Sequence, residues 1–139
     1  MNTFYRQCNL SVLTAFLPLV LSQNWIITAG HCCEEGTKTE DFKIFTDVEN
    51  ADKLNFSSFY RANSFHQHPD FGSAHELSHD FCLIKTSEEI SLKRGSVDFA
   101  CLPEPGISNN TNKCFTAGWG FDAIDGKLTS ELHSIQDQI

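Results

Sequence analysis

Two segments of the sequence carry side chains that could act together in catalysis. His31 directly follows the apolar run Asn24-Trp-Ile-Ile-Thr-Ala-Gly30, and Asp80 directly precedes a second run, Phe81-Cys-Leu-Ile-Lys85. An aspartate that accepts the Nδ1 proton of a histidine fixes the ring tautomer and leaves Nε2 to act as a general base near neutral pH. We therefore predict that the side chains of His31 and Asp80 lie within hydrogen-bonding reach.

The elements that must position these two side chains are predicted to be strands. Past residue 22 there is no 3.6-residue periodicity, and short β-branched and aromatic runs alternate with clusters of Gly, Pro, Asn and Asp. This pattern predicts an all-β domain, in which strand ends mount His31 and Asp80 rigidly. For Glu131 to Ile139, a strand and a short helix are both open. The predicted strands are Trp25 to Ala29, Phe42 to Thr46, Ser57 to Phe65, Phe81 to Thr86, and Cys114 to Phe121.

Four segments, in this order, resemble those of the trypsin-like (chymotrypsin-family) serine proteases. They correspond to the histidine segment, a His-Pro-x-aromatic turn, the aspartate segment, and the inter-barrel linker with the strand that enters the second barrel. In this sequence they read Trp25-Ile-Ile-Thr-Ala-Gly-His-Cys32, His68-Pro-Asp-Phe71, His79-Asp-Phe-Cys-Leu-Ile-Lys85, and Ala100-Cys-Leu-Pro103 followed by Cys114-Phe-Thr-Ala-Gly-Trp-Gly120.

The resemblance implies an all-β fold that begins with the first antiparallel Greek-key β-barrel of a two-barrel protease. That barrel would occupy about residues 23–99, the linker about 100–113, and the opening strand of the second barrel 114–139. The implied function is serine-type endopeptidase activity, with His31 as the general base and Asp80 as its orienting partner.

The cysteines match the family pattern only in part. Cys32 and Cys114 resemble family disulfide cysteines, and Cys101 resembles the cysteine often tied to a propeptide or light chain. Cys82 replaces the small residue usual in the aspartate strand, and Cys33 is additional. With six cysteines the pairing stays open.

The sequence also departs from the family in its catalytic parts. It contains no Gly-Asp-Ser-Gly-Gly segment, which would carry the nucleophile, and neither an Ile-Val-Gly-Gly-like start nor a Cys-Gly-Gly segment before His31. We therefore expect the 139-residue chain to be inactive by itself. The alternative to a protease is a non-catalytic binding or decoy module of the same fold.

Composition and charge restrict the partners. The chain of 139 residues has room for one ordinary domain, and its 10 basic and 18 acidic residues give a net charge of −8. This acidic charge argues against nucleic acid, whose binding requires a basic surface. The resemblance implies protein or peptide substrates or protease inhibitors as partners.

The apolar run 10–22 bears on localisation. It follows Arg6, contains Pro18, and falls short of the ~20 residues that a membrane-spanning helix needs. It has the layout of a secretory signal peptide, residues 1–22, and it also matches a first-barrel strand. Together with the six cysteines and the sequons at Asn55 and Asn109, it favours a secreted protein without membrane association.

Two patterns suggest metal chemistry as alternatives. His75-Glu-Leu-Ser-His79 matches the H-E-x-x-H zinc motif, but that motif requires a helix, and we predict that this stretch, with His66 and His68, is a polar surface loop. The acidic stretch with Asp47, Glu49, Asn50 and Asp52 could surround calcium, although its spacing is not that of an EF-hand. We expect neither a metal nor another cofactor.

Overall fold

The computed structural model describes residues 4–6, 18–102, 113–120 and 129–138. Within these ranges, three 3₁₀ helices connect strands: η1 (Gly30–Cys33), η2 (Thr39–Asp41) and η3 (Ala51–Lys53). The strands are β1 (Phe4–Arg6), β2 (Leu19–Ser22), β3 (Trp25–Thr28), β4 (Lys43–Thr46), β5 (Tyr60–Gln67), β6 (Cys82–Thr86), β7 (Lys113–Gly118) and β8 (His133–Gln138).

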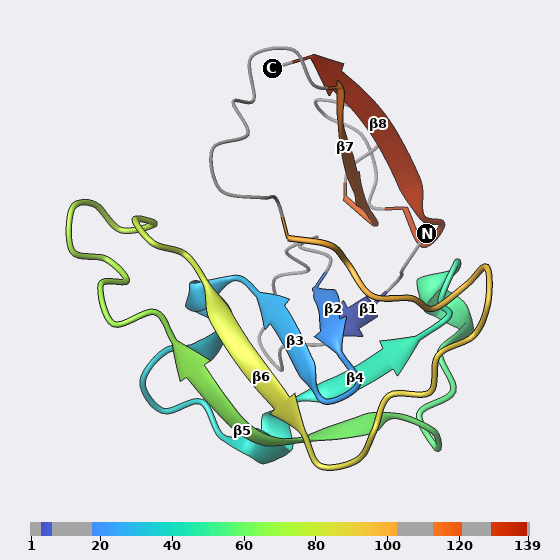
Figure 1. Cartoon of the computed structure of the whole chain (residues 1–139), viewed down its shortest axis with the longest axis horizontal. Helices are drawn as coiled ribbons and strands as arrows, with labels where there is room; N and C mark the ends of the chain where they lie inside the picture. Colours follow the sequence, from blue (N-terminus) through green and yellow to red (C-terminus); the bar gives the residue numbers. More distant parts are fainter. Residues whose placement is uncertain (1–3, 7–17, 103–112, 121–128, 139) are drawn as a thin grey trace.

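Strands β1 to β6 form one antiparallel sheet that curls into a half-barrel (Figure 1). Its strand order is β1-β4-β5-β6-β3-β2, so the chain crosses over between β3 and β4, as in a Greek key. Strands β7 and β8 pair separately, with registers running from Lys113 opposite Gln138 to Gly118 opposite His133. The prediction of an all-β, antiparallel fold is confirmed.

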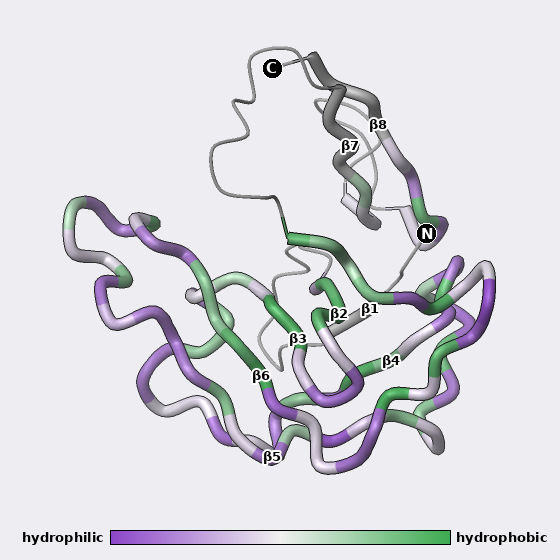
Figure 2. Tube along the Cα trace, viewed as in Figure 1, coloured by the Kyte–Doolittle hydropathy of each residue, from purple (hydrophilic) through white to green (hydrophobic). Residues whose placement is uncertain are grey.

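One inward-facing row of side chains shows why these strands pack together. Val20 of β2 lies opposite Ile26 of β3, which lies opposite Ile84 of β6, and each is at most 2% exposed. Alternation along β6 is complete, since Cys82, Ile84 and Thr86 are buried whereas the residues between them are exposed. In Figure 2, β3 and β6 are among the most hydrophobic stretches. Burial of this face stabilises the sheet by roughly 1.5–3 kcal/mol for each large side chain.

The bounds of β5 differ from the prediction at both ends. A turn delays its start, because the Asn55 side chain accepts a hydrogen bond from the Ser57 backbone at 3.0 Å and the Ser58 backbone donates to the Asn55 carbonyl at 2.9 Å. At the other end, pairing with β6 continues through Gln67. His66 therefore lies in a strand, and the prediction that it belongs to a surface loop is wrong.

The N-terminal apolar run lies only partly within the described residues. Leu19–Ser22 form β2, which pairs with β3, and Phe4–Arg6 form β1, which pairs with β4. Residues 7–17 lie outside the described residues, and the signal peptide over residues 1–22 stays a prediction. No helix in the described parts of the chain has the length and apolar character needed to cross a membrane.

Candidate active site

His31 is mounted where β3 turns into a 3₁₀ helix. β3 ends at Thr28, Ala29 is still extended, and η1 begins at Gly30, where the Cys32 backbone donates to the Ala29 carbonyl at 3.2 Å. The preceding strand is apolar and buried on alternate positions, so the sheet holds the base of η1. His31 thus projects from a strand end, as the sequence predicts.

Asp80 is mounted at the matching end of the neighbouring strand. β3 and β6 are antiparallel, and their ladder ends with Thr28 opposite Cys82, so the chain leaving β3 meets the chain entering β6. The Phe81 backbone donates to the His79 carbonyl at 2.7 Å, and His79 adopts a φ of 52°. This left-handed conformation costs a non-glycine residue roughly 1–2 kcal/mol. The tight turn places the Asp80 carboxylate beside η1.

The two side chains meet through two hydrogen bonds. Asp80 Oδ1 accepts from the His31 backbone N–H at 2.7 Å, and Asp80 Oδ2 lies 2.8 Å from His31 Nδ1. The side chains are 21% and 19% exposed, so solvent screens the contact only partly. With Nδ1–H donated to Asp80, Nε2 is the ring atom with the lone pair that a general base uses. The prediction that the two side chains lie within hydrogen-bonding reach is confirmed.

Close packing around Gly30 holds this pair in place. A Cβ atom at Gly30 would lie 2.9 Å from a ring carbon of Phe71, 3.0 Å from the Phe81 backbone nitrogen and 3.1 Å from Asp80 Oδ1. The Gln67 side-chain amide donates to the Gly30 carbonyl at 2.9 Å. Sequence reasoning missed Gln67, and the available signal was its position just before the His-Pro turn. Together these contacts seat η1 against the chain around Asp80.

A disulfide joins the same two segments. Cys33 of η1 bonds Cys82 of β6, and both are core residues, 3% and 1% exposed. Sequence analysis noted both cysteines as additions to the family pattern but did not pair them. Cys101 is exposed, Cys32 is buried, and the Cys114 side chain lies outside the described part. The likeness of Cys32 and of Cys114 to family disulfide cysteines remains a prediction, and no pairing between these two is implied.

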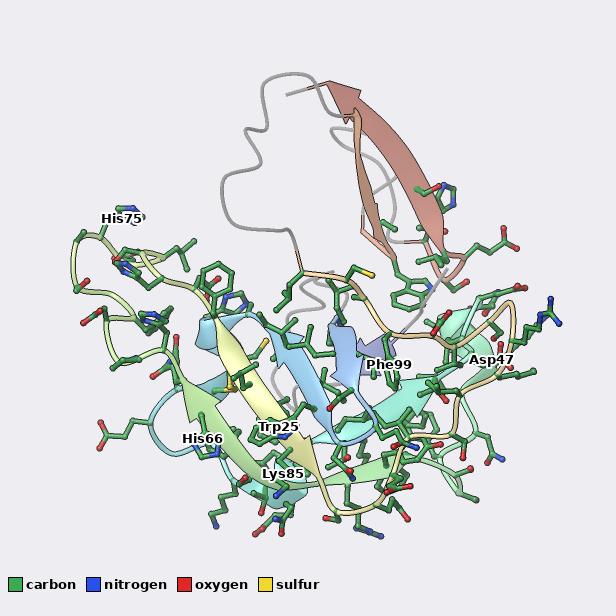
Figure 3. The ribbon with its side chains drawn as sticks, viewed as in Figure 1. Trp25, Asp47, His66, His75, Lys85 and Phe99 are labelled. Carbon is green, nitrogen blue, oxygen red and sulfur yellow. A yellow bond between two sulfur atoms is a disulfide. The ribbon has the colours of Figure 1, made fainter. Side chains whose placement is uncertain are left out.

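The histidine-rich loop does not have the form of a zinc site. The stretch His75 to His79 consists of bends and turns, whereas the H-E-x-x-H motif requires a helix. His75 lies at the far end of the loop (Figure 3), and the rings of His68 and His79 stack at 4.9 Å between centroids. Within the described ranges no group of three or more His, Cys, Asp and Glu side chains could hold a metal ion.

The acidic stretch after β4 is organised by hydrogen bonds within the protein. The Asp47 carboxylate accepts from Lys93 Nζ and from Ser96 Oγ. These two hydrogen bonds hold the pKa of Asp47 below its usual value, and the bond from Lys93 has the larger effect. The Asn50 side chain accepts from the Asp52 backbone at 2.9 Å. Two of the four possible calcium ligands are thus engaged within the protein.

Comparison with known proteins gives the fold and the site a family. The trypsin family, described as "Trypsin", matches residues 18–138, and the chain belongs to this family. U21-ctenitoxin-Pn1a of Phoneutria nigriventer is 24% identical over 123 residues, which cover 84% of this chain and 48% of that protein.

Two further relatives are vertebrate proteins. Chymotrypsin-like elastase family member 1 of Macaca fascicularis is 25% identical over 116 residues, covering 81% of this chain and 42% of the relative. The Homo sapiens protein of the same name is also 25% identical over 116 residues, covering 81% and 43%. The chain therefore spans less than half the length of the curated relatives that it matches.

Proposed function

We propose that this chain supplies the general-base half of a serine-type endopeptidase. The observation that carries the proposal is the pair of hydrogen bonds by which His31 is fixed to Asp80, through its backbone N–H at 2.7 Å and its ring Nδ1 at 2.8 Å. The bond at Nδ1 fixes the tautomer and orientation of the ring, and the bond to the backbone N–H fixes the Asp80 carboxylate against the residue that carries the ring. A base that must serve a single nucleophile needs such a fixed ring.

The proposed reaction is acyl transfer. As a serine Oγ bonds to the scissile carbonyl carbon, its proton moves to His31 Nε2, and the carbonyl oxygen takes up the negative charge. Asp80 stabilises the imidazolium that forms. When the C–N bond breaks, His31 returns the proton to the leaving amine, and the acyl-enzyme is then hydrolysed by water with His31 again acting as the base.

The nucleophile of this proposal lies outside the 139 residues. None of the serines in the sequence stands in a Gly-Asp-Ser-Gly-Gly segment, and the chain spans less than half of the relatives it matches. We assign the serine, the oxyanion-hole donors and the specificity pocket to the remaining half of a complete trypsin-family domain. His31 and Asp80 are the two members of the triad that this chain would contribute.

The proposed substrates are polypeptides, and protease inhibitors are the proposed alternative partners. Trypsin-family membership supports the polypeptide substrates. We propose a secreted protein, because the buried Cys33–Cys82 disulfide fits an oxidising compartment. The acidic net charge of −8 opposes binding to nucleic acid.

A second candidate function is a non-catalytic binding or decoy module. The sequence feature that favours it is the missing nucleophile segment. A domain that has the general base but no serine nucleophile could bind a polypeptide without cleaving it. The two functions differ in what the transcript encodes after Ile139.

The test is to sequence the transcript beyond codon 139, express its product, and treat it with a serine-directed fluorophosphonate probe. We expect a downstream Gly-Asp-Ser-Gly-Gly segment and labelling that His31→Ala abolishes. The matched control is His75→Ala, which changes an exposed histidine at the far end of the loop. A stop codon directly after Ile139, or a product that the probe does not label, contradicts the protease and favours the module. Labelling that survives His31→Ala contradicts the role of His31 as the general base.

A further inference from the structure

We infer that the Cys33–Cys82 disulfide is a positioning device for the His31–Asp80 pair, which it holds together through the main chain on both sides. The inference deepens the proposed function, because it concerns the same pair. It is independent of whether a serine is supplied, since the hydrogen bond between the two residues exists in this chain by itself.

The first argument is the matched position of the two links. Cys33 stands two residues after His31, and Cys82 stands two residues after Asp80, so the disulfide and the hydrogen bonds span the same sequence separation of 49. Both links therefore join the same two segments, one covalently in the interior and one by hydrogen bonds nearer the surface. A change in the separation of the two segments at one link must be felt at the other.

The second argument is that the strand pairing between β3 and β6 ends before the chain reaches His31. The β3–β6 ladder ends at the pair Thr28 and Cys82, whereas His31 lies three residues further along the chain, in η1. Past Thr28 the backbone of this segment is no longer fixed to β6 by strand pairing. The disulfide restores a fixed attachment at Cys33, on the far side of His31.

The third argument is the contrast in burial. Cys33 and Cys82 belong to the same core cluster as Val20, Ile26 and Ile84, whereas the side chains of His31 and Asp80 are 21% and 19% exposed. Close-packed interiors are rigid, while partly exposed hydrogen bonds compete with water. The bond thus couples a partly exposed pair to the rigid core.

The test reads the His31–Asp80 hydrogen bond directly, by nuclear magnetic resonance of the full 139-residue chain. An Nδ1 proton bonded to a carboxylate resonates downfield and exchanges slowly with water. Asp80→Asn identifies the signal by removing the carboxylate. The test variant is Cys33→Ala with Cys82→Ala. The matched control is Cys101→Ala, which removes an exposed cysteine that forms no disulfide within the described residues.

We expect the signal in the unmodified chain and in Cys101→Ala. In the double variant the Nδ1 proton signal should be lost or should exchange with water at least about tenfold faster. The methyl resonances of Ile26 and Ile84 should keep the positions they have in the folded chain. A second double variant, Cys33→Ala with Cys82→Val, refills the space without the bond. It should behave like the first, because the covalent link and not the volume fixes the two segments.

Three outcomes overturn the inference. A signal with unchanged exchange in the first double variant shows that the hydrogen bonds need no disulfide. Restoration by the valine variant shows that packing is sufficient. Unfolding of both double variants shows that the bond stabilises the whole barrel and not this pair in particular. None of these outcomes bears on the fluorophosphonate test, so failure of the inference and failure of the proposed function are distinguishable.

Discussion

Two carboxylates, Asp80 and Asp47, are tied to distant parts of the chain in similar ways and to different effect. Each accepts two hydrogen bonds, Asp80 from the backbone and ring of His31, and Asp47 from Lys93 and Ser96. The Asp80 side chain is 19% exposed and the Asp47 side chain 40%. We refer to the second group, Asp47, Lys93 and Ser96, as the Asp47 cluster.

The two groups differ in how the chain next to each carboxylate is attached to the rest of the protein. Asp80 is followed within two residues by Cys82, a fully buried member of a core disulfide. The partners of Asp47 come from the stretch Lys93–Val97, which is closed by a backbone hydrogen bond of 3.0 Å from Lys93 to Val97 and whose lysine side chain is 66% exposed. The same number of hydrogen bonds therefore orients a reactive ring in one place and tethers a surface loop in the other.

The largest expected effect comes from removing a core side chain on which both regions rest. Ile84 is 2% exposed, two residues after Cys82, and shares a core cluster with Val97, which adjoins Ser96. Ile84→Ala should lower the free energy of unfolding by about 2–5 kcal/mol, as a buried cavity costs. Urea denaturation measures the loss.

The matched control for this prediction is the residue directly before Ile84, which lies on the opposite face of β6. Leu83 is 38% exposed, so Leu83→Ala should cost less than about 1 kcal/mol. Equal losses for Ile84→Ala and Leu83→Ala would contradict the inside-outside assignment of β6, and with it the core that supports both carboxylates.

The strands that carry the site are the part of the fold that sequence predicts best. β3 and β6 have short apolar runs bounded by turn residues, and their observed bounds lie within one residue of the prediction. β1 was not predicted, because Phe4–Arg6 becomes a strand only by pairing with β4, a contact between distant segments. The late start of β5 depends on a turn built by one side chain, that of Asn55.

The same division holds at the candidate site. The contact of His31 with Asp80 could be predicted, because two strand-end motifs carry it and neighbouring antiparallel strands bring their ends together. The Cys33–Cys82 pairing could not be predicted, since with six cysteines Cys33 has five possible partners until the chain is folded. In retrospect, the equal offset of the two cysteines from His31 and Asp80 was the signal. The Gly30 contacts depend on the packing of Phe71, which no local pattern records.

A smaller effect distinguishes the two regions by glycine substitution. Gly30 has no room for a Cβ, which would meet Phe71, the Phe81 backbone and Asp80 at 2.9–3.1 Å. Gly95, beside Ser96 of the Asp47 cluster, has open space but a φ of +83°. We expect Gly30→Ala to cost about 1–3 kcal/mol through overpacking and Gly95→Ala about 1 kcal/mol through backbone strain, both measured by urea denaturation.

The two glycine variants should differ more in their effect on the site than on stability. Gly30→Ala pushes against Asp80 itself, so the downfield Nδ1 proton signal of His31 should shift or exchange faster. Gly95→Ala should leave that signal unchanged. An unchanged His31 signal in Gly30→Ala would mean that Phe71 absorbs the extra methyl group, and that the close packing at Gly30 does not position the pair.

The smallest expected effect is that of Asp47→Asn, and it depends on pH. Because Lys93 and Ser96 hold the native pKa of Asp47 below its unfolded value of about 3.9, the ionised carboxylate favours the folded state. This contribution is fully present above the unfolded pKa and is lost as the pH falls through the lower native pKa. The lysine side chain is 66% exposed, and solvent screening keeps the contribution below about 1 kcal/mol. Asp47→Asn should therefore lower the free energy of unfolding slightly at pH 7, and the difference from the unmodified chain should vanish on acidification, as followed by urea denaturation at a series of pH values.

The His31 Nδ1 signal should not respond to Asp47→Asn, because the Asp47 cluster shares no hydrogen-bond partner with the pair. A difference that persists unchanged at acid pH would place the effect in packing instead of charge, and a changed His31 signal would show that the two carboxylates are coupled.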